Sequence, residues 1–118
     1  MGLFTQRITI ADLSGENSVE IDAVVDTGSF YSVIPKYMLH QLDVEPIDRI
    51  SFRLVNDEPI EMDIGYAWIT LDGRRRITTV AFGSDTGPFL LGAFTLEGLE
   101  MAVDPHGKRL VHIDYLPA

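Results

Sequence analysis

The 118-residue sequence contains no cysteine. That absence excludes disulfide bonds, thiolate metal ligands and cysteine nucleophiles together. Basic residues are also few, with 9 lysines and arginines against 18 acidic residues and a formal net charge of -9. Such an excess of acid disfavours the phosphate backbone of nucleic acid as a partner.

Long apolar runs and closely spaced metal ligands are missing as well. No apolar stretch approaches the roughly 20 residues that span a bilayer, and the first residues lack the basic start and apolar segment of a secretory leader. We therefore expect a cytoplasmic protein that does not contact a membrane. His40, His106 and His112 are far apart in the sequence, whereas zinc ligands come in close pairs, so we expect no metal and no cofactor.

The pattern that is present predicts a mostly β chain, with residues 1–118 forming one domain. Runs rich in valine, isoleucine, threonine and aromatic residues alternate with turn residues, and Asp72-Gly73 is typical of a tight hairpin turn. Two short helices are expected, at residues 35–42 and 93–99. Strands are expected at residues 3–11, 19–25, 30–34, 50–55, 60–71, 77–82, 89–91, 100–103 and 109–113.

One acidic residue stands in an unusual position. The second expected strand runs through Ala23-Val24-Val25 directly into Asp26, with no polar boundary between them. A carboxylate at the end of a buried strand is costly to ionise unless a neighbour compensates it, which is typical of a functional group. Thr27-Gly28-Ser29 follows, and Gly28 allows another backbone to approach closely. Taken alone, the same residues also fit a turn that merely ends a strand.

A second Asp-Thr-Gly run occurs at residues 85–87. It follows Gly83-Ser84 and precedes Pro88, which is the composition of a loop and not of an apolar strand end. We interpret it as a loop and not as a second copy of the strand-end arrangement at Asp26.

The sequence resembles the retropepsin-like aspartic proteases, in particular their small bacterial and archaeal single-domain members. Three features carry the resemblance: the apolar run before Asp26-Thr27-Gly28-Ser29, the Leu90-Leu91-Gly92 run that leads into a helix, and a tail at residues 103–111 that resembles the final hairpin. The resemblance covers most of the chain, from about residue 3 to residue 113. The resemblance implies a mostly β, retropepsin-like acid-protease half-barrel with one or two short helices.

The resemblance also implies a function. In this family two chains pair about a two-fold axis, so that the two Asp26 carboxylates meet and activate a water that attacks a peptide bond. The chain is then an aspartic endopeptidase that acts as a homodimer on peptide or protein substrates. Thr27 is implied to link the two active-site loops, Gly28 to admit substrate or the partner backbone, and Ser29 to hydrogen-bond the carboxylate. The strands near Leu3-Phe4 and residues 111–113 are expected at the dimer interface.

A flap and a substrate groove complete the family pattern. We assign to them Val55, Asn56, Asp57 and Glu58 of the flap and Leu90, Leu91 and Gly92 of the groove. Pro59 and the acidic tip depart from the glycine-rich flaps of the family, and Phe30-Tyr31 and Ala93-Phe94 stand where relatives have polar residues. Two other interpretations stay open: a catalytically silent retropepsin-fold binding or dimerisation module, and an unrelated small β-barrel in which Asp26 caps a turn.

Overall fold

The computed structural model describes residues 4–53, 56–104 and 106–113. Its helices are α1 (Lys36–Gln41) and α2 (Ala93–Gly98). The strands are β1 (Thr5–Ala11), β2 (Ser18–Val25), β3 (Ser32–Pro35), β4 (Pro46–Arg53), β5 (Pro59–Leu71), β6 (Arg74–Gly83), β7 (Leu90–Leu91), β8 (Met101–Asp104) and β9 (Arg109–His112). The expected mostly β chain with two short helices is confirmed.

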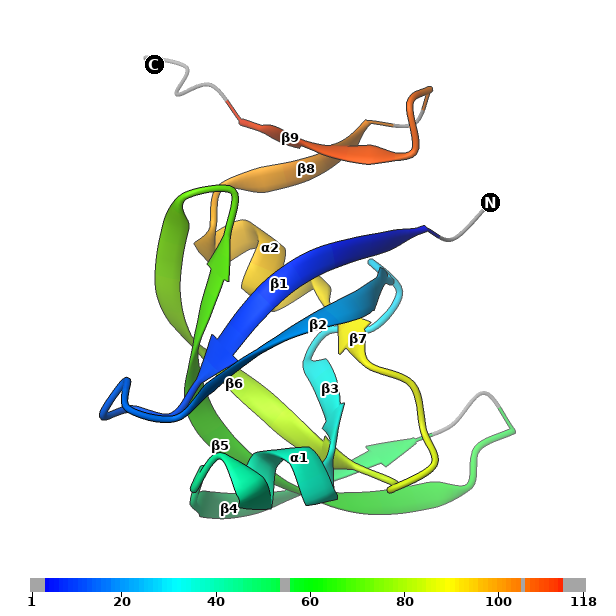
Figure 1. The fold of residues 1–118 in the computed structure, drawn as a ribbon. Coiled ribbons are helices and arrows are strands. Elements are labelled where there is room, and N and C mark those ends of the chain that lie inside the picture. Colours follow the sequence, from blue (N-terminus) through cyan, green and yellow to red (C-terminus); the bar gives the residue numbers. More distant parts are fainter. Residues whose placement is uncertain (1–3, 54–55, 105, 114–118) are drawn as a thin grey trace, which may run out of the picture.

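The main sheet closes on itself into a small barrel. Its seven strands follow the order β1-β2-β7-β3-β6-β5-β4, and β1 pairs a second time with β5. In that second pairing Thr9–Ala11 lies opposite Trp68–Thr70. This second pairing covers the other edge of β1 at Thr9–Ala11. The strands curve strongly (Figure 1), and the buried core cluster includes residues of β1, β2, β3, β5 and β6.

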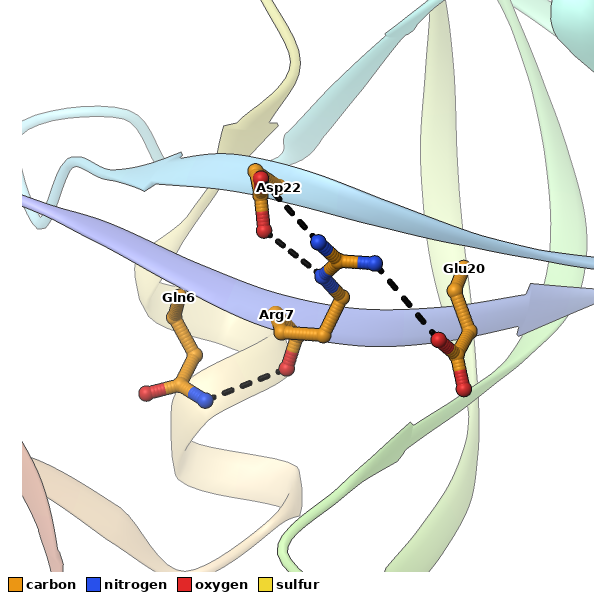
Figure 2. Close-up of polar contacts among 4 residues, drawn as sticks. All are labelled: Gln6, Arg7, Glu20 and Asp22. Atoms are coloured by element: carbon orange, nitrogen blue, oxygen red, sulfur yellow. Dashed lines mark hydrogen bonds and ion pairs between the residues drawn. The ribbon is translucent and has the colours of Figure 1, made fainter.

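The alternation of buried and outward-facing side chains explains the register of the β1–β2 hairpin. Ile8 is 2% exposed and lies opposite Ile21, which is 8% exposed, so these side chains point into the barrel. The intervening residues point outward, where Arg7 donates two hydrogen bonds to the carboxylate of Asp22 and lies 3.5 Å from that of Glu20 (Figure 2). A register shift of one residue would bury these charges.

The β5–β6 hairpin turns at the predicted dipeptide. Asp72 has φ 50° and Gly73 has φ 81°, the two positive values that a type I′ turn requires. This turn suits the right-handed twist of the flanking strands, which then run together from Leu71↔Arg74 to Ile64↔Ala81. The hairpin therefore forms the long central part of the barrel wall.

Several boundaries differ from those expected. The strand expected at residues 30–34 begins at Ser32, because the backbone carbonyls of Ser29 and Phe30 accept hydrogen bonds from residues 93 and 94 and not from a neighbouring strand. Pro35, expected inside the first helix, is the last residue of β3 and precedes α1. Strand β4 begins at Pro46 and not at residue 50, since it stays paired with β5 as far as Gly65.

The shortest strand, β7, occupies the most constrained place in the sheet. Leu90 and Leu91 pair in parallel with Val24 and Val25 of β2, and Leu90 pairs on its other side with Val33 of β3. Leu91 is fully buried. This pairing brings residues 90–92 directly beside the loop that joins β2 to β3, which carries Asp26.

The C-terminal hairpin lies outside the main sheet and packs against the core through Met101, Val103 and Leu110. Strands β8 and β9 form their own two-stranded sheet and lie beyond α2 and the β5–β6 turn (Figure 1). Arg74 donates a hydrogen bond of 2.8 Å to the backbone carbonyl of Leu99, and His112 lies 2.7 Å from the carboxylate of Asp72. A two-stranded hairpin is marginal alone, so these contacts with the barrel stabilise it.

Candidate active site

Asp26 is the first residue after β2, and backbone groups hold it on two sides. Its own N–H donates to the carbonyl oxygen of Leu91 at 3.0 Å. Its Oδ1 accepts a 3.0 Å hydrogen bond from the N–H of Gly28. Val25 is 4% exposed, whereas Asp26 is only partly buried. The strand is thus buried as predicted, but the carboxylate reaches the surface and can meet a substrate or a second chain.

The loop after Asp26 is bonded along its length to the segment after β7. The N–H of Ala93 donates to the carbonyl of Ser29 at 2.8 Å, and the N–H of Phe94 donates to that of Phe30 at 2.9 Å. Gly92 directly precedes Ala93, and a Cβ added to Gly92 would stand 2.4 Å from the carbonyl oxygen of Tyr31. Only glycine leaves room for this approach, which explains why the third residue of the Leu90-Leu91-Gly92 run is a glycine.

The three residues after Asp26 have different surroundings. Thr27 and Gly28 are exposed, on the same surface as the carboxylate. A Cβ on Gly28 would lie 3.2 Å from Oδ1 of Asp26, so a larger residue would press on the carboxylate. The hydroxyl of Ser29 donates to the carbonyl of Tyr31 at 2.7 Å. The structure thus gives the Ser29 hydroxyl a backbone partner in place of the expected carboxylate.

A cleft of about 420 Å³ opens between this loop and the β4–β5 hairpin. The alternation of side chains along β4 and β5 explains the apolar lining. Phe52 pairs with Ile60, and Ile50 pairs with Met62, which places these side chains on one face of the hairpin. The opposite face carries charged residues. The described residues that line the cleft are Asp26, Gly28, Ser29, Phe30, Tyr31, Val33, Phe52, Arg53, Ile60 and Met62.

Aromatic side chains form a continuous row across the cleft. Phe52 of β4 meets Tyr31 edge-on with ring centroids 5.8 Å apart, Tyr31 meets Phe30 at 5.0 Å, and Phe30 meets Phe94 of α2 at 5.4 Å. Phe30 is 57% exposed and Phe94 is 41% exposed. The row thus joins the hairpin, the Asp26 loop and α2, and it leaves apolar surface beside the carboxylate.

The predicted flap residues lie at the tip of the hairpin. Asn56, Asp57 and Glu58 are exposed, and none of the three is among the described residues that line the cleft; Val55 lies outside the described residues. The N–H of Glu58 donates to the side-chain oxygen of Asn56, and Arg53 donates to the carbonyl of Asp57 at 3.2 Å. These bonds give the tip a defined turn at the edge of the cleft.

Leu90, Leu91 and Gly92 support the site from behind, and the described lining of the cleft does not include them. The lining residues that the sequence interpretation missed are those of the hairpin face, such as Phe52, Ile60 and Met62. Strand alternation carried the necessary information, since Phe52 and Ile60 lie symmetrically about the tip.

Residues 4–53, 56–104 and 106–113 contain no group of three or more histidine, aspartate or glutamate side chains that could hold a metal ion. In the same ranges, neither helix has the length and apolarity that crossing a bilayer requires.

Many solved structures are similar to this chain, and three of them are viral proteins with a protease domain. The EIAV protease, complexed with the inhibitor HBY-793, has a TM-score of 0.60 at 21% identity, covering 83% of this chain and 88% of that one. The solution structure of the simian foamy virus (mac) protease has a TM-score of 0.54 at 18% identity, covering 78% and 92%. The foamy viral protease-reverse transcriptase in complex with an RNA/DNA hybrid has a TM-score of 0.55 at 15% identity, covering 79% and 12%.

No family model matches the sequence, and neither does any curated protein. At these identities the structural similarity establishes the fold. The chain has the retropepsin-like fold of retroviral and foamy viral proteases.

Proposed function

We propose that the protein is a homodimeric aspartic endopeptidase, in which Asp26 of each protomer supplies one of two catalytic carboxylates. The observation that carries the proposal is the position of Asp26. It lies at the end of a buried strand, held by Leu91 and Gly28, and its carboxylate opens onto an apolar cleft.

The chemistry needs two carboxylates in contact. Like charges at that distance disfavour double ionisation, so the pair retains one proton. The ionised member accepts a proton from water, which attacks the peptide carbonyl, while the protonated member donates to the carbonyl oxygen. Collapse of the tetrahedral species transfers a proton to the leaving nitrogen, and no covalent bond to the enzyme forms. One chain carries half of this set, so a second copy must complete it.

The surface around Asp26 supports pairing with a second copy. Thr27 and Gly28 are exposed beside the carboxylate, and Phe30 adds a large exposed apolar ring to the same loop. In a dimer Thr27 would link the two loops and Gly28 would admit the partner or the substrate backbone. Two-fold pairing would repeat each contact on both chains.

The chain ends provide further contact surface. The carbonyl of Phe4 accepts a 2.8 Å hydrogen bond from the N–H of Val25, which places the start of β1 next to Asp26. Ile113 is 48% exposed at the end of the C-terminal hairpin. We propose that these two regions also contact the partner, while Leu3 lies outside the described residues.

The β4–β5 hairpin would close over substrate. Its apolar face, with Phe52 and Ile60, would cover the peptide, while the tip at Asn56, Asp57 and Glu58 would reach across the cleft. Leu90, Leu91 and Gly92 would hold the floor of the groove. No cofactor is required by this mechanism.

The test is cleavage of a diverse peptide library between about pH 4 and 7, since a reaction that depends on a coupled carboxylate pair varies with pH. Wild type, wild type with pepstatin and Asp26→Asn are compared at equal concentration. The proposal expects cleavage by wild type that pepstatin inhibits and Asp26→Asn abolishes. A folded dimer that cleaves nothing would contradict it and favour the silent binding or dimerisation module.

A further inference from the structure

Three buried hydroxyls meet behind the Asp26 loop. The oxygens of Ser32 and Thr95 lie 2.6 Å apart, and those of Thr95 and Thr78 lie 3.0 Å apart. The three residues are 0%, 1% and 5% exposed, and they come from β3, α2 and β6. Thr95 is the central member, because it contacts both of the others.

This cluster continues into the backbone beside Asp26. The hydroxyl oxygen of Ser32 accepts a 3.0 Å hydrogen bond from the N–H of Gly92. The carbonyl of Leu91 belongs to the same peptide unit, and it accepts the N–H of Asp26 at 3.0 Å. A peptide unit is planar and rigid, so the orientation of its N–H determines the orientation of its carbonyl. Ser32 and Asp26 therefore hydrogen-bond to opposite ends of the same rigid peptide unit.

The pairing of β7 and the buried side chain of Leu91 hold the carbonyl side of this peptide unit. On the amide side Gly92 has no side chain, and the Ser32 hydroxyl is the acceptor of its N–H. A hydroxyl can donate and accept at once, so the chain Thr78, Thr95, Ser32 can satisfy every member. In the described residues, no buried side-chain nitrogen or oxygen lacks a partner. Loss of the central hydroxyl would leave two buried hydroxyls each short of one partner.

We infer that the Thr78–Thr95–Ser32 hydroxyl cluster orients the Leu91–Gly92 peptide unit and, through it, the backbone of Asp26, so that Thr95 is a positioning residue for the proposed reaction. The inference rests on the proposed function for its catalytic consequence. Its structural part, the control of the Gly92 amide, is independent of any activity.

The experiment compares Thr95→Val, which keeps the shape and removes the hydroxyl, with Thr95→Ser, which keeps the hydroxyl. Misplacement of a catalytic group lowers kcat more than it weakens substrate binding, so Thr95→Val is expected to lower kcat about tenfold and to change KM less than about twofold. Thr95→Ser is expected to keep kcat within about twofold of wild type. Amide hydrogen exchange at Gly92 and Asp26 is expected to be faster in Thr95→Val and close to wild type in Thr95→Ser.

Three results would overturn the inference: unchanged kcat in Thr95→Val, unchanged exchange at Gly92, or a Thr95→Ser variant as impaired as Thr95→Val. If Thr95→Val does not fold, Thr78→Val replaces it, since it removes the outer hydroxyl and leaves the Ser32–Thr95 contact. It is then expected to accelerate exchange at Gly92 to a smaller extent, and no change would count against the cluster. If wild type cleaves no peptide, the proposed function fails, while the exchange data still decide whether the hydroxyls control the peptide unit.

Discussion

The chain contains two Asp-Thr-Gly runs, and they have different surroundings. Asp26 follows the buried end of β2 and receives the N–H of Gly28 on its carboxylate, while its own N–H bonds to Leu91. Asp85 is exposed in the loop between β6 and β7. Its carboxylate accepts the N–H of Tyr37, at 3.2 Å, at the start of α1.

The difference shows what defines the candidate site. The second run lies in a loop turn, in which the N–H of Gly87 donates to the carbonyl of Ser84 at 3.0 Å, and its Asp85 bonds to a helix start. Asp26, by contrast, bonds to Leu91 of β7, and it lines the cleft together with Gly28. The tripeptide alone therefore does not define the candidate site; the preceding buried strand and the Leu90-Leu91-Gly92 partner distinguish it.

The largest expected difference between the two runs is in activity. Asp26→Asn removes the carboxylate that serves as base or acid in the proposed reaction, so we expect the rate of peptide cleavage to fall on the order of 10³-fold. Asp85→Asn is the matched control and should keep the wild-type rate, because Asp85 lies outside the cleft. Steady-state cleavage of the best library peptide measures both. Equal loss in the two variants would mean that Asp26 has no special role.

A second prediction compares two glycines, Gly92 beside the Asp26 loop and Gly98 at the end of α2, which differ in the space around them. Gly92→Ala would place a Cβ 2.4 Å from the backbone oxygen of Tyr31, which must move. We expect Gly92→Ala to lower the free energy of unfolding by an amount near or above the top of the roughly 1–3 kcal/mol range that is typical of overpacked sites. Gly98→Ala is the control, since nothing lies within 4 Å of its added Cβ at the end of α2, and it should stabilise by up to about 1 kcal/mol. Urea denaturation monitored by fluorescence of Trp68 compares them, and a neutral Gly92→Ala would refute the close approach.

The capping role of Asp85 predicts a smaller effect. Pro35 precedes α1 and provides no side-chain cap, so Asp85 supplies an acceptor from a distant loop. Asp85→Ala should lower the free energy of unfolding by about 0.5–1 kcal/mol without changing activity. Asp85→Asn keeps an acceptor oxygen and should lose less. Thermal unfolding followed by circular dichroism distinguishes them, and identical Tm values in all three proteins would exclude the cap.

A third carboxylate in a turn, Asp12, sharpens the comparison, because its hydrogen-bond partners Ser14 and Asn17 belong to its own turn. Asp12 is 7% exposed. The hydroxyl of Ser14, followed by the backbone and side-chain amides of Asn17, holds the pKa of Asp12 below its ordinary 3.8. A lowered pKa stabilises the fold at higher pH, and this stabilisation is lost as the pH falls below about 4 through the folded-state pKa. Asp12→Asn should therefore lose less stability than wild type between pH 5 and pH 3 in urea denaturation, and an equal loss would contradict this origin.

Much of the fold follows from local pattern. Alternation of Ile8 and Ile10, the Asp72-Gly73 turn and the short apolar β7 all predicted elements that the structure confirms. These features depend on neighbours in the sequence or on burial alone. Strand ends were less predictable: β4 extends to Pro46 because β5 continues opposite it, and that partner is not a local property.

The candidate site was predicted in outline and missed in detail. The resemblance located Asp26 and the Leu-Leu-Gly run, and the structure brings the two together. The partner of the Ser29 hydroxyl could not be predicted, because several acceptors lie within reach in a turn and only its backbone path selects one. The cleft lining was placed at the tip of the hairpin, whereas the apolar faces of β4 and β5 provide it through Phe52 and Ile60.

The central claim, that two copies of Asp26 act together, is tested most directly by mixing wild type with Asp26→Asn protomers at constant total protein. After subunit exchange, only dimers with two intact carboxylates should cleave, so activity should follow the square of the wild-type fraction. An equal mixture should then retain about one quarter of the wild-type rate. Retention of about one half would mean that each chain acts alone, and would contradict the shared active site.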